Sequence, residues 1–355
     1  MIPFNKPFLT GKETFYIEQA VRSGKISGDG IFTEKCHQFF QQRYGFKKCL
    51  LTTSCTAALE MSAILLDISP GDEVIMPSYT FVSTANAFVL RGAKIIFCDS
   101  ANDNPNIDVS KIESLITAKT KVIVPVHYAG MACNMDVIMD LAAKYNLFVV
   151  EDAAQAIDSY YNGKPLGSFG HLATFSFHET KNVMAGEGGM LVINDERFFD
   201  RAEIIREKGT NRPALFRGEV DHYGWVDIGS SFLPSEVISA FLYAQLENLE
   251  KVQKKRLQIW NRYLKELKPL EEKGQIKLLK ISNGATNNGH IFPILTQNLH
   301  ERDKFISHLK TKNIYSVFHY LSLHKSPFYK PYYSGLPLMN SDRYSETLVR
   351  LPLYY

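Results

Sequence analysis

The sequence predicts an α/β protein with a mostly parallel central sheet and helices on both of its faces. Between about residues 50 and 194, short runs of β-branched or aromatic residues alternate with helical stretches. Each run holds about five apolar residues, as is usual for strands buried on both faces. Ligands of such sheets bind beyond the carboxyl ends of the strands, so the residues that follow each run are the first candidates for a site.

The apolar runs predict six strands in this part of the chain, each with the short length typical of a strand. They are EVIMP (73–77), KIIFCD (94–99), KVIVPVH (121–127), LFVVED (147–152), ATFSF (173–177) and GMLVIN (189–194). Apolar residues at helical spacing predict helices between them at 56–68 and 135–146.

A second, smaller α+β domain is expected at the C-terminal end. A long amphipathic stretch from Pro234 to about Leu270 predicts one helix that connects the two domains. After it come a predicted strand, helix and strand, at 290–295, 301–313 and 314–320. The predicted division is a large domain with the N-terminal segment, 1–245, and a small C-terminal domain, 246–355.

The bulk composition excludes several functional classes. The 40 Lys and Arg against 37 Asp and Glu give a net charge of +3, too even for a nucleic-acid surface or an anionic membrane. No apolar run approaches the roughly 20 residues that span a bilayer, and the N-terminus lacks the apolar region of a signal peptide. None of the five cysteines forms a C-x-x-C pair, so no metal site is expected. We expect a cytoplasmic protein without nucleic-acid or membrane partners.

Two chemically active side chains follow predicted strands. Asp152 ends the run 147–152, where it is either a functional carboxylate or an ordinary helix N-cap. Lys181 lies in SFHETKN, after the run 173–177 and before the glycine-rich segment AGEGGM. A lysine so placed can point into a cleft, where desolvation lowers its pKa and its amine can form a Schiff base. The alternative is a solvated surface lysine.

A third cluster is the start of the helix at 56–68. Ser54, Cys55 and Thr56 stand where free backbone N–H groups and the positive helix end attract an anion such as phosphate. The alternative is ordinary capping by Ser and Thr. Ser176, close to Lys181, offers another hydroxyl. Phe81 or Tyr79 can supply a flat surface, although either can equally be a core residue.

Together these groups describe a site for pyridoxal 5'-phosphate. That cofactor needs a lysine for a Schiff base, a carboxylate for its pyridine nitrogen, a phosphate cradle and a flat side chain against its ring. No single cluster is specific, but their order along one α/β unit is.

The chain resembles the pyridoxal phosphate-dependent nucleotide-sugar aminotransferases of the DegT/DnrJ/StrS family, which have the fold-type I, aspartate aminotransferase-like architecture. The matching segments are TTSCTAALE, GDEVIMPSYTFVSTANA, VIVPVHYAG, FVVEDAAQA, SFHETKN, GEGG and VFHYLSLH. Three segments, SFHETKN, REKGTNR and VDIGSS, are especially similar to the dTDP-4-amino-4,6-dideoxygalactose transaminases.

The resemblance implies roles for individual residues. Lys181 matches the lysine that binds the cofactor, Asp152 the carboxylate at the pyridine nitrogen, and Gln155 the residue beside the phenolic oxygen. Phe81 matches the aromatic that stacks on the ring. The remaining matches are the phosphate cradle, formed by Ser54, Cys55, Thr56 and Ser176, and the sugar end of the site, formed by His319, Tyr320 and His324.

The resemblance also implies the reaction. We expect transamination of dTDP-4-keto-6-deoxy-D-glucose at C4, with L-glutamate as donor and pyridoxamine phosphate as the intermediate form of the cofactor. The product would be dTDP-4-amino-4,6-dideoxy-D-galactose, for surface polysaccharides such as lipopolysaccharide or enterobacterial common antigen. A homodimer with the active site at its interface is implied.

Two positions depart from the family pattern. Cys55 stands where many members have glycine, which backbone N–H binding tolerates. Ser231 stands where many have an asparagine that reaches the phosphate of the neighbouring subunit, so that cross-subunit contact is in doubt here.

Other functions fit less well. The gluco epimer or another keto-sugar nucleotide is the first alternative, and a sugar dehydratase of the same fold is the second. Dehydratases of this kind replace the lysine with histidine, whereas this chain keeps Lys181 with His178 nearby. A Rossmann dehydrogenase would need G-x-G-x-x-G, and SGDGIF (27–32) lacks the third glycine. A regulator of transcription would need a DNA-binding domain, and no helix-turn-helix is evident.

Two further features invite a hypothesis. The glycine-rich segment 23–33 has the composition of a flexible loop that closes over the sugar. Arg206, Arg212 and Arg217 form a basic stretch that either meets the nucleotide diphosphate or is solvated surface charge.

Overall fold

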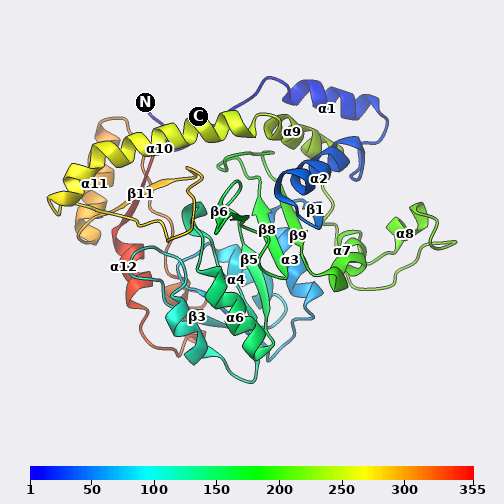
Figure 1. Cartoon of the computed structure of the whole chain (residues 1–355), viewed down its shortest axis with the longest axis horizontal. Coiled ribbons are helices and arrows are strands. Elements are labelled where there is room, and N and C mark those ends of the chain that lie inside the picture. Colours follow the sequence, from blue (N-terminus) through cyan, green and yellow to red (C-terminus); the bar gives the residue numbers. More distant parts are fainter.

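A seven-stranded sheet forms the centre of the computed structural model, which describes all 355 residues (Figure 1). The strand order is β1-β9-β8-β5-β4-β2-β3. Only β9 runs against its neighbours, so the predicted mostly parallel sheet is confirmed. The strands are β1 (Lys48–Thr52), β2 (Glu73–Pro77), β3 (Lys94–Cys98), β4 (Thr120–Ile123), β5 (Phe148–Asp152), β8 (Leu172–Ser176) and β9 (Gly189–Ile193).

Helices cover both faces of this sheet, as the sequence predicts. Alternate strand residues point to opposite faces, so Cys49 and Leu51 enter one core while Leu50 enters the other. On the first face lie α2 (Ile31–Tyr44), α6 (Met135–Tyr145) and α9 (Glu236–Leu246). On the second lie α3 (Cys55–Leu65), α4 (Val82–Val89) and α7 (Phe199–Arg206).

The predicted strands are present, most of them to within one residue at either end. The run predicted at 121–127 is the exception, because β4 ends at Ile123. Pro125 lacks the N–H that a central strand must donate, so the ladder cannot continue through it. Shorter elements complete this part of the chain: α5 (Val109–Ile112), β6 (Tyr160–Tyr161), β7 (Lys164–Pro165) and α8 (Arg212–Phe216).

The prediction of a single connecting helix from Pro234 to Leu270 is wrong. The structure has two helices there, α9 and α10 (Leu249–Glu272), separated by Glu247 and Asn248. The two helices bury different faces against different partners: α9 packs against the large sheet and α10 against the small one. One straight helix cannot reach both. Figure 1 shows α10 running across one edge of the molecule.

A three-stranded antiparallel sheet organises the C-terminal region. Its order is β10 (Lys277–Leu278), β11 (Phe292–Leu295) and β12 (Leu348–Leu351). The aromatic and aliphatic side chains of α10 and α11 (Leu299–Thr311) pack on it. None of the helices is both long enough and apolar enough to cross a membrane.

The strand predicted at 314–320 does not form, and β12, preceded by α12 (Met339–Thr347), takes its place. Only Val317 of that segment bridges to Arg350. The next part of the segment is fastened elsewhere: the hydroxyls of Tyr79 and Tyr128 both donate to the carbonyl oxygen of His319. This attachment brings His319 and its neighbour to the large sheet.

The glycine-rich segment 23–33 is not the free lid expected from its composition. It joins α1 (Glu13–Arg22) to α2, and the buried Glu236 carboxylate accepts N–H groups from Gly30, Phe32 and Thr33. Gly30 is required there, because a Cβ would lie 2.6 Å from the Glu236 Cδ. The segment is therefore fastened to the start of α9.

Candidate active site

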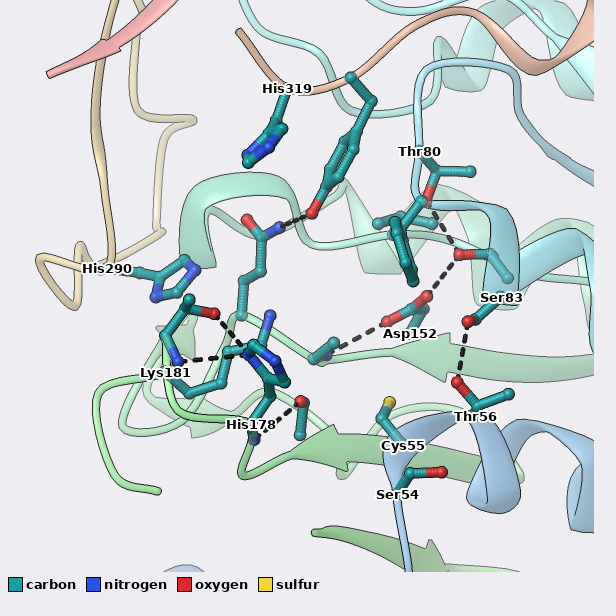
Figure 2. Close-up of a pocket in the computed structure, with 18 of the residues that line it drawn as sticks. Ser54, Cys55, Thr56, Thr80, Ser83, Asp152, His178, Lys181, His290 and His319 are labelled. Atoms are coloured by element: carbon teal, nitrogen blue, oxygen red, sulfur yellow. Dashed lines mark hydrogen bonds between the residues drawn. The ribbon is translucent and has the colours of Figure 1, made fainter. Parts of the chain in front are cut away.

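A cavity of about 450 Å³ lies at the carboxyl ends of β5 and β8, between the large sheet and the C-terminal region. Every site residue predicted from the sequence lines it, except His324. Figure 2 shows Lys181, Asp152 and the start of α3 around this cavity. The lining set from the prediction is Ser54, Cys55, Thr56, Phe81, Asp152, Gln155, Ser176, Lys181, His319 and Tyr320.

Asp152 is the last residue of β5, and its carboxylate is buried. Its Oδ2 accepts from Thr84 Oγ1 at 2.7 Å, and its Oδ1 accepts from the Ala154 N–H at 3.2 Å. Thr84 in turn lies 2.9 Å from the hydroxyl of Thr80. Turns rather than a helix follow Asp152, so the N-cap interpretation is wrong. Burial raises the pKa of Asp152, and the hydrogen bonds from Thr84 and Ala154 and the charge of Lys181 offset this rise only in part.

Lys181 lies in the connection between β8 and β9 and lines the same cavity. It forms no salt bridge, and burial lowers the pKa of its amine to about 8. Near neutral pH a much larger fraction of this amine is therefore unprotonated than of an ordinary lysine, as a base or nucleophile requires. The interpretation as a solvated surface lysine is wrong.

The start of α3 forms an anion cradle. Ser54 is the N-cap, and its Oγ accepts from the Ala57 N–H at 3.0 Å. The N–H groups of Cys55 and Thr56 find no acceptor within the chain and lie at the positive end of the helix. Thr56 Oγ1 donates to Ser83 Oγ at 2.8 Å, which adds a second hydroxyl (Figure 2).

The backbone of this cradle rests on Gly189, the first residue of β9. A Cβ at that position would lie 2.2 Å from the Ser54 carbonyl carbon and 2.4 Å from the Cys55 nitrogen. Only glycine lets β9 pass this close beneath the turn. The glycine-rich segment that follows Lys181 thus also shapes the phosphate end of the cavity.

The structure chooses between the two candidate aromatics. Tyr79 is fully buried in a cluster with Tyr128 and Tyr344 and is therefore a core residue. Phe81 is 53% exposed and lines the cavity, with its ring centroid 5.8 Å from that of Tyr320. Phe81 is the residue placed to cover a flat ligand.

Gln155 is held in place from two sides. Its Oε1 accepts from the Ala129 N–H at 2.7 Å, and its Nε2 donates to Tyr320 Oη at 3.1 Å. The amide therefore bridges the large sheet to the segment that carries His319 and Tyr320. Its orientation in the cavity is fixed before any ligand binds.

Several predicted positions lie outside the cavity. His324 is buried 2.7 Å from Ser78 Oγ, near the separate cleft that Asp342 lines, so its assignment to the sugar end is wrong for this chain. Ser231 lies on the exposed edge that bridges to Glu207. Arg206 is buried and paired with Asp29 at 2.6 Å, so it is neither surface charge nor a contact to a nucleotide in this cavity.

The other two arginines of the basic stretch are exposed and paired with acidic residues, so for them the interpretation as surface charge is confirmed. Arg217 pairs with Glu203 and Glu219, each at 2.7 Å, and Arg212 lies 3.8 Å from Glu207. None of them lines the cavity.

Sequence reasoning missed several lining residues, because they reach the cavity by tertiary packing. Ser83 and Thr84 lie on α4, where no strand end marks them. His127 follows β4, and its Nε2 lies 3.0 Å from Glu151 Oε2, but a strand-end histidine alone is not specific. Phe4, His290 and Arg350 were also missed, and they come from the N-terminal segment, the loop before β11, and β12.

The chain is similar to known proteins over nearly its whole length. The model of the DegT/DnrJ/EryC1/StrS aminotransferase family matches residues 8–355. GDP-perosamine synthase from Escherichia coli O157:H7 is 34% identical over 338 residues, which is 95% of this chain and 89% of that protein.

Two solved structures have the same fold. Spr1654 from Streptococcus pneumoniae, solved in PLP and PMP forms, has a TM-score of 0.90 at 26% identity, with 100% of this chain and 94% of that chain covered. DesV from S. venezuelae has a TM-score of 0.88 at 26% identity, with 99% and 93% covered.

Proposed function

The chain belongs to the DegT/DnrJ/EryC1/StrS aminotransferase family, and on that premise we propose that it transfers the amino group of L-glutamate to C4 of dTDP-4-keto-6-deoxy-D-glucose. That it is a pyridoxal phosphate-dependent sugar aminotransferase follows from the family and its solved members. The donor, the sugar and the nucleotide are the proposed parts. The observation that carries the proposal is the convergence of Lys181, Asp152 and the start of α3 on one cavity.

The residues present fit pyridoxal phosphate at each of its functional groups. The unpartnered N–H groups of Cys55 and Thr56 would bind the phosphate, with Ser54, Ser83 and Ser176 adding hydroxyls around it. Asp152, buried without a cation, would accept a hydrogen bond from the protonated ring nitrogen. Phe81 would cover the ring, and Gln155 would lie beside its phenolic oxygen.

The bound cofactor supplies a ring that accepts the electrons left when the donor loses its α-proton. Lys181 would remove that proton as general base and, as general acid, would deliver it to the exocyclic carbon of the cofactor, which its lowered pKa favours. Asp152 would hold the proton on the ring nitrogen and so keep the ring electron-poor. Because the donor leaves before the sugar enters, ping-pong kinetics are expected.

The nucleotide is the least constrained part of the substrate. The segments SFHETKN, REKGTNR and VDIGSS support a dTDP sugar and a galacto product. The similarity to GDP-perosamine synthase supports a GDP-linked keto sugar as the alternative. His319 and Tyr320 line the same cavity as the phosphate cradle, and we place the sugar beside them, over the cofactor.

A homodimer is part of the proposal. Large apolar side chains are exposed at the end of α8 and on the segment after it, namely Phe216, Tyr223, Trp225 and Val226. Such a cluster on one excursion of the chain is typical of a protein–protein interface. We place the enzyme in the cytoplasm, in the biosynthesis of surface polysaccharides, and retain the domain division at 245/246.

The test is an assay of the purified holoenzyme with L-glutamate and dTDP-4-keto-6-deoxy-D-glucose, beside the GDP-linked form of the same keto sugar. Formation of 2-oxoglutarate and of a 4-amino sugar, with the C4 configuration read by NMR, would support the proposal. Turnover of the GDP sugar alone would show that the proposed nucleotide is wrong. An equatorial amine at C4 would show that the proposed galacto configuration is wrong.

The same assay distinguishes the proposed aminotransferase from the alternative, a sugar dehydratase. A dehydratase would release a sugar that has lost a hydroxyl without gaining nitrogen. Position 181 is a lysine, and not the histidine that a dehydratase would have there, which favours transamination. A deoxygenated product without nitrogen would contradict the proposal.

A further inference from the structure

The cavity contains a buried cation without an acidic partner, Arg350 of β12. Its side chain lines the cavity and is only 5% exposed. Its single side-chain hydrogen bond runs from Nη1 to the Nδ1 of His319 at 2.7 Å, and its Nε is buried with no partner at all. A buried charge of this kind is costly unless something pairs with it.

The surroundings of Arg350 keep this charge uncompensated. Burial and the neighbouring guanidinium lower the pKa of His319 to about 4, so the imidazole is a neutral acceptor. The ring of Phe4 lies 4.9 Å from the Arg350 Cζ and shields one side of the guanidinium. The group of three residues therefore carries one positive charge and no negative one.

The other buried arginines differ from Arg350 in how their side chains are paired. Arg206 pairs with Asp29 at 2.6 Å, and Arg302 pairs with Asp303 at 2.9 Å. Arg256 has no acid but donates to the carbonyl oxygens of residues 289, 290 and 353. Of these four buried arginines, only Arg350 has a buried nitrogen without a hydrogen-bond partner, its Nε, and only Arg350 lines the cavity. Its missing partner is therefore expected to be a ligand.

We infer that Arg350, oriented by His319, binds the α-carboxylate of the amino donor. The inference rests on the proposed transamination. The carboxylate of an amino acid is bonded to the carbon that gives its proton to Lys181, so its counter-charge must lie in the same cavity as that lysine. The diphosphate of a sugar nucleotide is attached at C1, across the sugar ring from the reacting C4. A planar guanidinium also matches a planar carboxylate.

The test separates the two half-reactions in single-turnover experiments. The PLP form is mixed with L-glutamate, and the PMP form is mixed with the keto sugar, for Arg350→Met, Arg350→Lys and the surface control Arg343→Met. We expect Arg350→Met to raise the half-saturating glutamate concentration by about 100-fold, as for a lost partner of a buried charge. Arg350→Lys should recover part of that loss, and the sugar half-reaction should change by less than about threefold.

Two further readouts isolate the carboxylate. L-Alanine and isopropylamine differ only in a carboxylate against a methyl group, so wild type should prefer alanine and Arg350→Met should lose that preference. Calorimetric binding of glutarate to the PLP form measures the subsite without turnover, and it should disappear in Arg350→Met but persist in Arg343→Met.

The outcomes are distinguishable. Unchanged glutamate saturation and glutarate binding in both Arg350 variants would overturn the inference, as would a loss confined to the sugar half-reaction, which would assign Arg350 to the diphosphate. A wild-type enzyme that reacts with glutamate but aminates no keto sugar offered would refute the proposed sugar and leave this inference standing. If Arg350→Met does not fold, the comparison of Arg350→Lys with wild type decides.

Discussion

At the scale of single residues, the cavity holds an amine and a carboxyl that do not neutralise each other. Burial lowers the pKa of Lys181 to about 8 and raises that of Asp152, so each is moved towards its neutral form. Opposed shifts of this kind characterise sites where one group gives and another takes a proton. A ligand that binds both side chains offsets the free-energy cost of burying them.

The lowered pKa of Lys181 sets a pH dependence for cofactor capture. Only the unprotonated amine attacks an aldehyde, so the rate of PLP incorporation into apoenzyme should rise with pH and level off above a midpoint of about 8. Stopped-flow absorbance of the apoenzyme mixed with PLP measures it. Lys181→Ala is the control and should show no such phase. A midpoint near that of an ordinary lysine would show that the amine is solvated.

The Asp152→Asn variant tests the carboxylate with almost no change of shape. The amide can keep its contact with Thr84 but cannot hold the ring nitrogen protonated. PLP binding should persist within about tenfold, while the rate of α-proton removal from glutamate should fall by about 100-fold or more. Single-turnover rates with protiated and α-deuterated glutamate measure this step. Asp140→Asn, on the exposed face of α6, is the control, and a wild-type rate in Asp152→Asn would contradict the role.

What the sequence predicts at this scale depends on strand ends. Asp152, Lys181 and Ser54 were predictable because each lies at or shortly after the end of a strand whose apolar run is visible. Thr84 and Arg350 were not, because one lies within a helix and the other within a strand, and only tertiary packing turns them towards the cavity.

At the scale of elements, the passage of β9 beneath the start of α3 determines the shape of the phosphate cradle. Gly189 has no room for a Cβ, whereas a Cβ at the preceding Gly188 would meet nothing closer than 3.4 Å. The two glycines are adjacent in sequence and differ only in this contact. They therefore offer a matched pair of substitutions.

Gly189→Ala should push the Ser54–Cys55 turn away from β9 and weaken the cofactor's phosphate contacts. We expect PLP affinity to fall by at least about tenfold and the protein to lose about 1–3 kcal/mol of stability, as for overpacking in a tight site. Equilibrium dialysis and thermal unfolding measure the two effects. Gly188→Ala should leave both close to wild type, and equal effects of the two substitutions would contradict this account.

The elements that composition and periodicity predicted wrongly share a cause. A continuous helical pattern crosses Glu247 and Asn248, yet the chain turns there because α9 and α10 bury their apolar faces against different sheets. The segment 314–320 has strand composition but is drawn to the cavity by Tyr79 and Tyr128. Both outcomes depend on partners distant in sequence, which local patterns do not encode.

At the scale of the whole molecule, the proposed homodimer makes the segment after α8 the place to test. Trp225 is 86% exposed, and Phe216 at the end of α8 is 73% exposed. A Trp225→Glu, Phe216→Glu variant should sediment as a monomer at micromolar concentration and lose most transaminase activity, because buried charges oppose an apolar interface. Tyr332→Glu, at an exposed position outside this segment, is the control. A variant that sediments like wild type would place the interface elsewhere.

The large sheet was predictable as a whole, since alternating strands and helices leave few topologies for a parallel α/β unit. The small sheet was predictable in kind but not in membership, because β12 lies far from β11 in sequence and its four residues carry no distinctive pattern.

The reversed direction of β9 has a consequence for how the enzyme should fail on heating. The chain leaves β8, carries Lys181 in the connection 177–188, and returns into the neighbouring strand, so both ends of the segment that bears the reactive amine are held by interior strands of the sheet. Such a tether cannot fray independently of the strands that hold it. Cofactor release and inactivation should therefore coincide with cooperative unfolding of the large sheet. In an enzyme whose reactive group lies on a mobile loop, they would precede it.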